Sequence, residues 1–280
     1  MGCRLEIIGK TNTGRTRKNN EDSFVIEPDL GFMIVADGMG GHASGEVASR
    51  LASTLCAQQL KRSLQTGHVP IFYHVPNNPS LDPRTHILGD CVKFANSAVY
   101  EASQKQSENK NMGTTLVAAL FLDDKLAIAN VGDSRLYLIR GDDLVQCTVD
   151  HSFVQEQIDK GLIDPDEAEQ SDMKHLLTRC IGNQEDVEVD MKEIELKPSD
   201  FILLCSDGLT KMLKDKEIMA TFQELKDPDG IASSLIDKAN NAGGKDNITV
   251  LVAHVAEDHL SLSSWTDRLK KLFQHKAERK

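Results

Sequence analysis

Residues 114–147, TTLVAALFLDDKLAIANVGDSRLYLIRGDDLVQC, carry the clearest signal for the fold of this 280-residue chain. Four apolar runs follow one another here, and short polar turns such as Asp123-Asp124 and Gly141-Asp142-Asp143 lie between them. Connections this short join antiparallel strands, because parallel strands need a crossover of a dozen or more residues. The stretch therefore predicts an antiparallel meander.

Apolar runs and helical patterns extend in both directions from this meander. Residues 32–36 and 201–205 predict two more strands that each lead into an aspartate, and residues 248–255 predict a last strong strand. Apolar residues at helical spacing predict helices over residues 45–64, 87–106 and 231–241. We expect an α+β fold, a four-layer αββα sandwich of two antiparallel β-sheets flanked by helices.

Three segments depart from this pattern. Residues 66–90 are predicted to be a surface insertion, rich in Pro and His up to residue 83, and residues 150–180 a mobile, polar excursion between strands. Residues 259–280 are predicted to form a basic amphipathic C-terminal helix with an apolar stripe at Trp265, Leu269, Leu272 and Phe273. Such a helix docks on its own domain, on a partner or on a membrane surface, and the sequence leaves these alternatives open.

The composition excludes several classes of protein. The chain has 32 basic and 43 acidic side chains, a net charge of −11, which opposes a nucleic-acid-binding surface. No apolar run approaches the ~18 residues of a membrane-spanning helix, so we expect no transmembrane segment. Six cysteines without a Cys-x-x-Cys pair indicate free thiols in a reducing compartment, so we expect a cytoplasmic protein.

Four aspartates stand next to Gly, Asn or Ser near the ends of predicted strands: Asp37, Asp133, Asp207 and Asp246. One such aspartate is an ordinary turn signal, but several that converge repel one another unless a cation neutralises them. All-oxygen sites suit Mg²⁺ or Mn²⁺, and Gly38 lets its own carbonyl approach a metal ion because it has no side chain. The pattern predicts a site for divalent cations.

The same residues belong to short motifs that follow one another along most of the chain. In order, they are GRTRKNNED (14–22), DGMGGH (37–42), MGTT (112–115), GDSR (132–135), DHS (150–152), LTR (177–179), SDGL (206–209) and DNIT (246–249). Together they resemble the PPM, or type 2C, family of metal-dependent protein serine/threonine phosphatases, most closely its bacterial single-domain members. The resemblance implies that residues 1–258 form the phosphatase domain and that residues 150–180 match the family's variable flap.

The resemblance also implies a catalytic core. Asp37 would bridge two Mn²⁺ or Mg²⁺ ions, and the Gly38 carbonyl would bind one of them. Asp207 and Asp246 would complete the shell of the second ion. The two ions would activate a bridging hydroxide that attacks phosphorus directly, so that phosphoserine and phosphothreonine in proteins are hydrolysed. Such an enzyme would oppose a serine/threonine kinase.

Four further residues match the edges of that core. Arg17 matches the residue that clamps the substrate phosphate, a role that suits a bidentate guanidinium. Glu21 and Asp22 fall where the family holds metal-bound water or a ligand. Asp133, together with Asp207, matches the position of a third metal ion in bacterial relatives.

The proton donor for the leaving alkoxide is where the sequence departs from the family. Many eukaryotic relatives have a histidine directly after Asp-Gly, but this position is Met39 here. His42 and His151 are the nearest substitutes by motif and are candidate general acids.

Two other functions remain as alternatives from the residues alone. A catalytically silent phosphatase-like module would bind a phosphoprotein, but Asp37, Asp207 and Asp246 are all present. A metal-dependent nuclease would use similar carboxylates, but the acidic charge and the low aromatic content of 5% oppose it.

Overall fold

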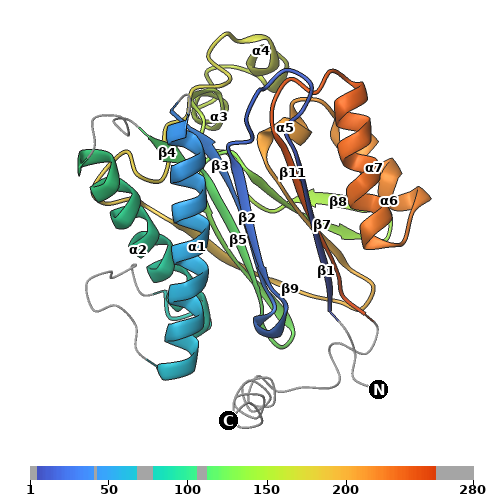
Figure 1. Ribbon diagram of the computed structural model, residues 1–280. Coiled ribbons are helices and arrows are strands. Elements are labelled where there is room, and N and C mark those ends of the chain that lie inside the picture. Colours follow the sequence, from blue (N-terminus) through green and yellow to red (C-terminus); the bar gives the residue numbers. More distant parts are fainter. Residues whose placement is uncertain (1–4, 41–42, 68–77, 106–111, 257–280) are drawn as a thin grey trace.

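Two antiparallel sheets form the centre of the computed structural model, which describes residues 5–40, 43–67, 78–105 and 112–256 (Figure 1). The first sheet has the strand order β1 (Glu6–Asn12), β11 (Ile248–His254), β10 (Phe201–Cys205), β7 (Arg135–Arg140) and β8 (Asp143–Gln146). The second has the order β2 (Asp22–Glu27), β3 (Phe32–Met39), β5 (Leu116–Phe121), β6 (Lys125–Val131) and β9 (Asp190–Glu195), with β4 (Gly113–Thr114) beside β3.

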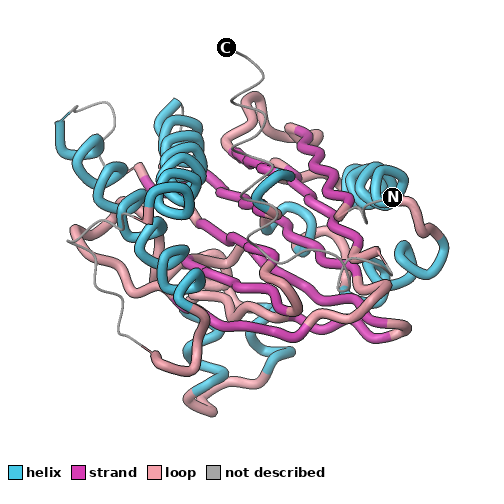
Figure 2. Tube along the Cα trace, turned by 90° about the horizontal axis from the view of Figure 1, so that it is seen from below, coloured by secondary structure: helices cyan, strands magenta, loops and turns pink. Residues whose placement is uncertain are grey.

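Helices cover the outer faces of both sheets. The second sheet carries α1 (Ala43–Thr66) and α2 (Pro83–Lys105), and the first carries α6 (Asp215–Glu224) and α7 (Pro228–Asn241). Figure 2 shows the strands between these two sets of helices. Four short elements complete the order: the 3₁₀ helix Pro28–Leu30, α3 (Phe153–Asp159), α4 (Pro165–Gln170) and α5 (Asp207–Thr210). The predicted αββα layering is confirmed.

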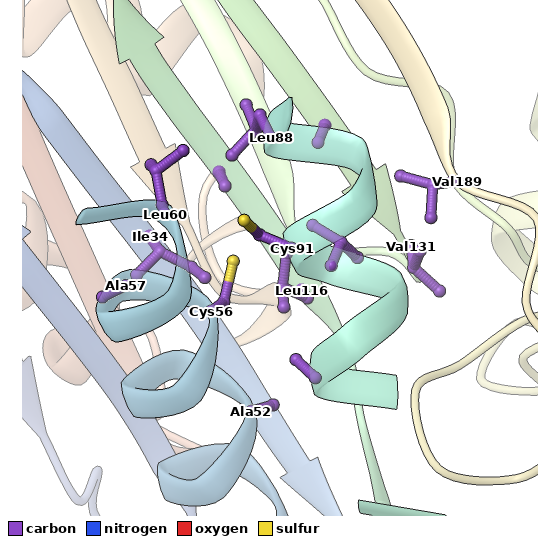
Figure 3. Packing of buried hydrophobic residues seen from close by; sticks show 14 of the residues in the cluster. Ile34, Ala52, Cys56, Ala57, Leu60, Leu88, Cys91, Leu116, Val131 and Val189 are labelled. Atoms are coloured by element: carbon purple, nitrogen blue, oxygen red, sulfur yellow. The ribbon is translucent and has the colours of Figure 1, made fainter. Parts of the chain in front are cut away.

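Three apolar clusters separate the four layers, one between the sheets and one under each helix pair. Strands such as β5 are apolar along their whole length because both of their faces are covered. Figure 3 shows Cys56 of α1 and Cys91 of α2 packed beside Leu60 and Leu88. Burial raises the pKa of Cys56 to about 12, so this thiol acts as a small apolar side chain.

The predicted continuous meander is wrong at one connection. Strands β5 and β6 pair with each other, and so do β7 and β8, but β6 and β7 belong to different sheets. The chain crosses between the sheets at residues 132–134, where Gly132 has a φ of +107° that a residue with a side chain rarely adopts. This crossover places Asp133 between the two sheets.

The predicted insertion is too long at its C-terminal end. Helix α2 begins at Pro83, a residue favoured in the first turn of a helix, so residues 83–90 are helical. Helix α6 was not predicted. His42 and the predicted helix over residues 259–280 lie outside the described residues. None of the helices in the described part of the chain is long and apolar enough to cross a membrane.

Candidate active site

The predicted carboxylates meet at one end of the sandwich. Asp37 lies near the end of β3, Asp207 follows β10, Asp246 precedes β11, and Asp133 lies in the crossover between β6 and β7. These four side chains and Glu21 line one cleft of about 490 Å³. In Figure 1 the cleft end of the strands is the upper end, beside α3 and α4. Both sheets therefore contribute acidic groups to one site.

Asp37 is held by the MGTT motif. Its backbone N–H donates to Thr115 Oγ1 at 3.0 Å, and its carbonyl accepts from the Thr115 N–H at 2.9 Å and the Thr114 hydroxyl at 2.8 Å. Thr115 Oγ1 also lies 2.7 Å from Ser134 Oγ, in the turn that carries Asp133. This motif thus fixes Asp37 and ties it to the Asp133 turn.

Gly38 is a glycine because backbone surrounds it. A Cβ atom built there would overlap the carbonyl oxygen of Gly45 and lie 2.5 Å from that of Glu21. The Gly38 N–H donates to the same Glu21 oxygen at 3.1 Å. Any side chain at this position would therefore push the opening motif away from β3.

Asp22 does not line the cleft; it lies beneath it. It pairs with Asp37 across β2 and β3, and its Oδ2 accepts from Ser206 Oγ at 2.8 Å and Thr249 Oγ1 at 2.7 Å. Thr249 lies in β11 and Ser206 directly follows β10, both strands of the first sheet, so Asp22 links the two sheets. Burial raises the pKa of Asp22 to about 7, since it outweighs the two hydroxyl donors.

The acidic groups destabilise one another's charged forms. Burial first, and then the charges of Asp22 and Asp207, raises the pKa of Asp37 well above its usual range. Burial and Asp207 likewise raise the pKa of Asp133 to about 7. A nearby cation would favour the ionised forms of all these groups.

The donor set fits a hard divalent cation. The buried Oδ1 atoms of Asp22 and Asp207 have no hydrogen-bond partner among the described residues, and carboxylate oxygens are the ligands that Mn²⁺ and Mg²⁺ prefer. Among residues 5–40, 43–67, 78–105 and 112–256, however, no three His, Cys, Asp or Glu side chains already surround one point. Two cationic side chains contact Asp207 and Asp246 instead.

Arg17 and Lys211 are these cations. Arg17 Nε lies 2.8 Å from Asp246 Oδ1 and Nη2 lies 3.0 Å from Oδ2, and the Arg17 side chain is 50% exposed at the rim. Lys211 Nζ contacts Asp207 Oδ2 and lies 3.2 Å from Asp246 Oδ2. Burial lowers the pKa of Lys211, but the charges of Asp207 and Asp246 raise it more. Sequence reasoning missed Lys211, although it stands four residues after Asp207.

His151 does not reach the cleft, so the structure does not support it as a general acid. Its Nδ1 accepts a hydrogen bond from the Gly132 N–H at 3.0 Å and therefore carries no proton. Its Nε2 lies 3.3 Å from Asp190 Oδ2, and its side chain is only 6% exposed. His151 instead fastens the Asp133 crossover to the base of residues 150–180. Met39 does line the cleft.

Two more side chains of the cleft were not predicted. Asn247 Oδ1 accepts from the Glu21 N–H at 2.8 Å, and its Nδ2 donates to the carbonyls of Thr13 and Asn19, both at 2.9 Å. This residue fastens the opening motif to the start of β11; its place in the DNIT motif was the available signal. His175 lines the cleft from the segment 150–180, and burial lowers its pKa.

A second hollow, of about 560 Å³, lies beside β6, the edge strand β9 and the residues that follow β8. Lys93, Lys192 and three carboxylates line it together with apolar residues, but it contains none of the predicted site residues. Its size alone does not make it the active site, since the converging carboxylates lie elsewhere.

Known proteins match most of this chain. A family model described as "Protein phosphatase 2C" matches residues 11–238. The serine/threonine phosphatase stp of Listeria monocytogenes is 36% identical over 249 residues, which cover 87% of this chain and 93% of the relative.

Solved structures agree with the sequence matches. The crystal structure of the Mycobacterium tuberculosis serine/threonine phosphatase PstP/Ppp is 35% identical with a TM-score of 0.78, covering 90% of this chain and 99% of that one. A PstP catalytic domain in complex with two manganese ions is 34% identical with a TM-score of 0.75, covering 90% and 98%. This chain therefore belongs to the protein phosphatase 2C, or PPM, family and is an Mn²⁺- or Mg²⁺-dependent protein serine/threonine phosphatase.

Proposed function

We propose that Asp37, the Gly38 carbonyl, Asp207 and Asp246 hold two divalent cations at the cleft. The observation that carries this proposal is the buried, unpartnered Oδ1 of Asp207 in a cleft where carboxylates of both sheets converge. In this proposal Asp37 would be a ligand of both ions, and Asp207 and Asp246 would be ligands of the second. When bound, the ions supply an activated water as nucleophile and neutralise charge on the phosphoryl group.

Three acidic residues take supporting roles in the proposal. Glu21 lines the cleft and is proposed to hold water or an ion there, while Asp22 orients the floor through Ser206 and Thr249. Asp133 is proposed to hold a third ion together with Asp207, because the charge of Asp207 acts directly on its carboxylate.

Arg17 is proposed to bind and orient the substrate phosphate. Its guanidinium has five N–H donors and Asp246 engages only two of its nitrogens, so donors remain at the exposed rim. Charge-assisted bonds from a planar guanidinium fix phosphate oxygens in direction as well as in position.

The segment 150–180 is proposed to act as the flap that contacts the peptide around the phosphoresidue. His175, Leu176 and Leu177 line one wall of the cleft, and a loop of this kind suits selection between substrates. Met39 lines the cleft without a titratable proton, so the proton for the leaving alkoxide must come from another group or from water.

Phosphate release from a phosphothreonine peptide tests these roles. The chelated full-length chain should be inactive, Mn²⁺ should restore turnover, and Asp207→Asn should lower it by on the order of 10²-fold or more. The matched control is Asp237→Asn, an exposed change on α7 at a residue that does not line the cleft. Full activity in the presence of chelator, or in Asp207→Asn, would overturn the assignment.

The cellular setting is also a proposal. The substrates are phosphoproteins, so a serine/threonine kinase must supply them, and this phosphatase is proposed to oppose such a kinase. A reducing, cytoplasmic location is supported by the five free thiols among the described residues, at positions 56, 91, 147, 180 and 205. Residues 1–258 are proposed as the phosphatase domain and residues 259–280 as a basic appendage for a partner or a membrane surface.

A further inference from the structure

Lys211 is a positively charged residue whose side chain contacts two of the proposed metal ligands. It follows α5, and its ammonium group contacts Asp207 and reaches to 3.2 Å from Asp246. The Lys211 side chain is 28% exposed, and those of Asp207 and Asp246 are 15% and 19% exposed. The ammonium therefore joins carboxylates that come from the ends of two different strands, β10 and β11.

This contact differs from an ordinary surface ion pair. An exposed lysine four residues from an aspartate on a helix contributes little, because both side chains stay in water. Here the lysine lines the cleft together with Asp37 and Asp133, and its charge acts on both of them. Arg17, the other cation among the described lining residues, sits at the rim and contacts Asp246 only.

We propose that Lys211 is a built-in counter-ion that holds Asp207 and Asp246 together in the metal-free protein and competes with the divalent cation for them. The inference rests on the proposed role of these two residues as metal ligands. A carboxylate oxygen that accepts from an ammonium group cannot donate the same lone pair to a metal ion. Asp207 Oδ1 has no such partner among the described residues, but a metal ion that takes Asp207 Oδ2 or Asp246 Oδ2 displaces the ammonium group, which the flexible four-carbon stem of lysine permits.

The competition has a predictable direction and size. A single positive charge a few ångströms from a divalent ion changes the affinity of the site by on the order of tenfold, even with the dielectric constant of water. Removing the charge should therefore tighten metal binding and, at the same time, weaken the metal-free fold, whose carboxylates lose their neutralising partner. If Lys211 only stabilised the fold, removal of its charge would have the opposite effect on metal affinity. The site would become looser and would bind the metal ion less tightly.

Lys211→Met tests the proposal, because it keeps an unbranched side chain that is one atom shorter and removes its charge. We would strip the full-length chain with a chelator and titrate it with Mn²⁺ alone, using isothermal titration calorimetry and the electron paramagnetic resonance signal of free Mn²⁺. Urea unfolding with and without Mn²⁺ gives the stability. The matched control is Lys216→Met, an exposed lysine on α6 that does not line the cleft.

We expect Lys211→Met to lower the Mn²⁺ dissociation constant of at least one site by about tenfold. The metal-free variant should unfold at a lower urea concentration than the wild type, and Mn²⁺ should raise its free energy of unfolding by more. Lys216→Met should match the wild type in all three. Unchanged or weaker Mn²⁺ binding in folded Lys211→Met overturns the inference. If this variant does not fold without metal, Lys211→Gln, refolded with Mn²⁺ and titrated with a chelator of known affinity, gives the same comparison.

The two proposals fail in different ways. If Asp207→Asn binds Mn²⁺ as well as the wild type, the ligand assignment fails and the lysine inference falls with it. If Asp207→Asn loses Mn²⁺ while Lys211→Met binds like the wild type, only the inference on Lys211 is wrong.

Discussion

Replacing Asp37 with Asn should have opposite effects on activity and on the stability of the metal-free protein. The carboxylate at this position is proposed to bridge both ions, so its loss should lower turnover on a phosphothreonine peptide by on the order of 10²-fold or more. That factor corresponds to about 2.7 kcal/mol of transition-state stabilisation. The amide of Asn keeps the shape of the side chain, so the backbone bonds to Thr114 and Thr115 remain.

The stability effect follows from the raised pKa of Asp37, whose causes are burial first and then Asp22 and Asp207. As pH rises above the ordinary aspartate range, the unfolded chain releases this proton while the folded chain still holds it. The metal-free protein therefore loses stability with rising pH until the pKa of the folded state is passed. Each pKa unit is equivalent to about 1.4 kcal/mol, which sets the scale of the gain expected from Asp37→Asn at pH 8.

Urea unfolding of chelated protein at pH 5, 6, 7 and 8 measures this gain directly. Asp37→Asn should exceed the wild type by a margin that grows with pH, and the control Asp237→Asn should follow the wild type throughout. A metal-free Asp37→Asn that is no more stable than the wild type at pH 8 would refute the electrostatic reasoning. Undiminished turnover would refute the catalytic role.

Three further outcomes are expected. Mn²⁺ at about 100 times its dissociation constant should stabilise the chelated protein by ~2.7 kcal/mol per site, raising the melting temperature by roughly 5–10 °C, and calorimetry showing no rise would contradict the metal site. Asn247→Ala should lower the free energy of unfolding by about 3 kcal/mol, because three hydrogen bonds to backbone groups are lost, and a loss below ~1 kcal/mol in urea would be inconsistent with this anchor. Met39→His should raise the phosphoserine-peptide rate relative to nitrophenyl phosphate by up to ~10²-fold, whereas an unchanged ratio would mean that protonation is already supplied elsewhere.

Much of the fold could be predicted because its strands are buried on both faces and therefore read as continuous apolar runs. The same runs end at the cleft, which is why Asp37 and Asp207 could be singled out before any coordinates. The assignment of β6 and β7 to different sheets could not be predicted, because periodicity reports which face is buried and not which neighbour a strand pairs with. The pairing of the strands shows the crossover, and the positive φ of Gly132 marks where the chain makes it.

The parts of the site that sequence reasoning missed depend on side-chain direction. His151 directly follows Asp150 and Lys211 stands four residues after Asp207. His151 turns away to Gly132 and Asp190, whereas Lys211 turns into the cleft. Spacing along a strand or helix does not distinguish these cases. Asp22 could be assigned to the opening motif, but its position below the cleft follows only from Ser206 and Thr249, which are far away in sequence.

Asp22 joins strands of the two sheets, and the cleft above it draws its acidic groups from both. A fragment or a partly unfolded state that keeps only one sheet retains half of the proposed ligands and has no floor to the cleft. A divalent ion bound here would therefore act as a crosslink between the two halves of the sandwich, and it would dissociate when they separate. Metal affinity would then report whether the sheets are docked, and depletion of the ion would favour opening of the sandwich at this end first.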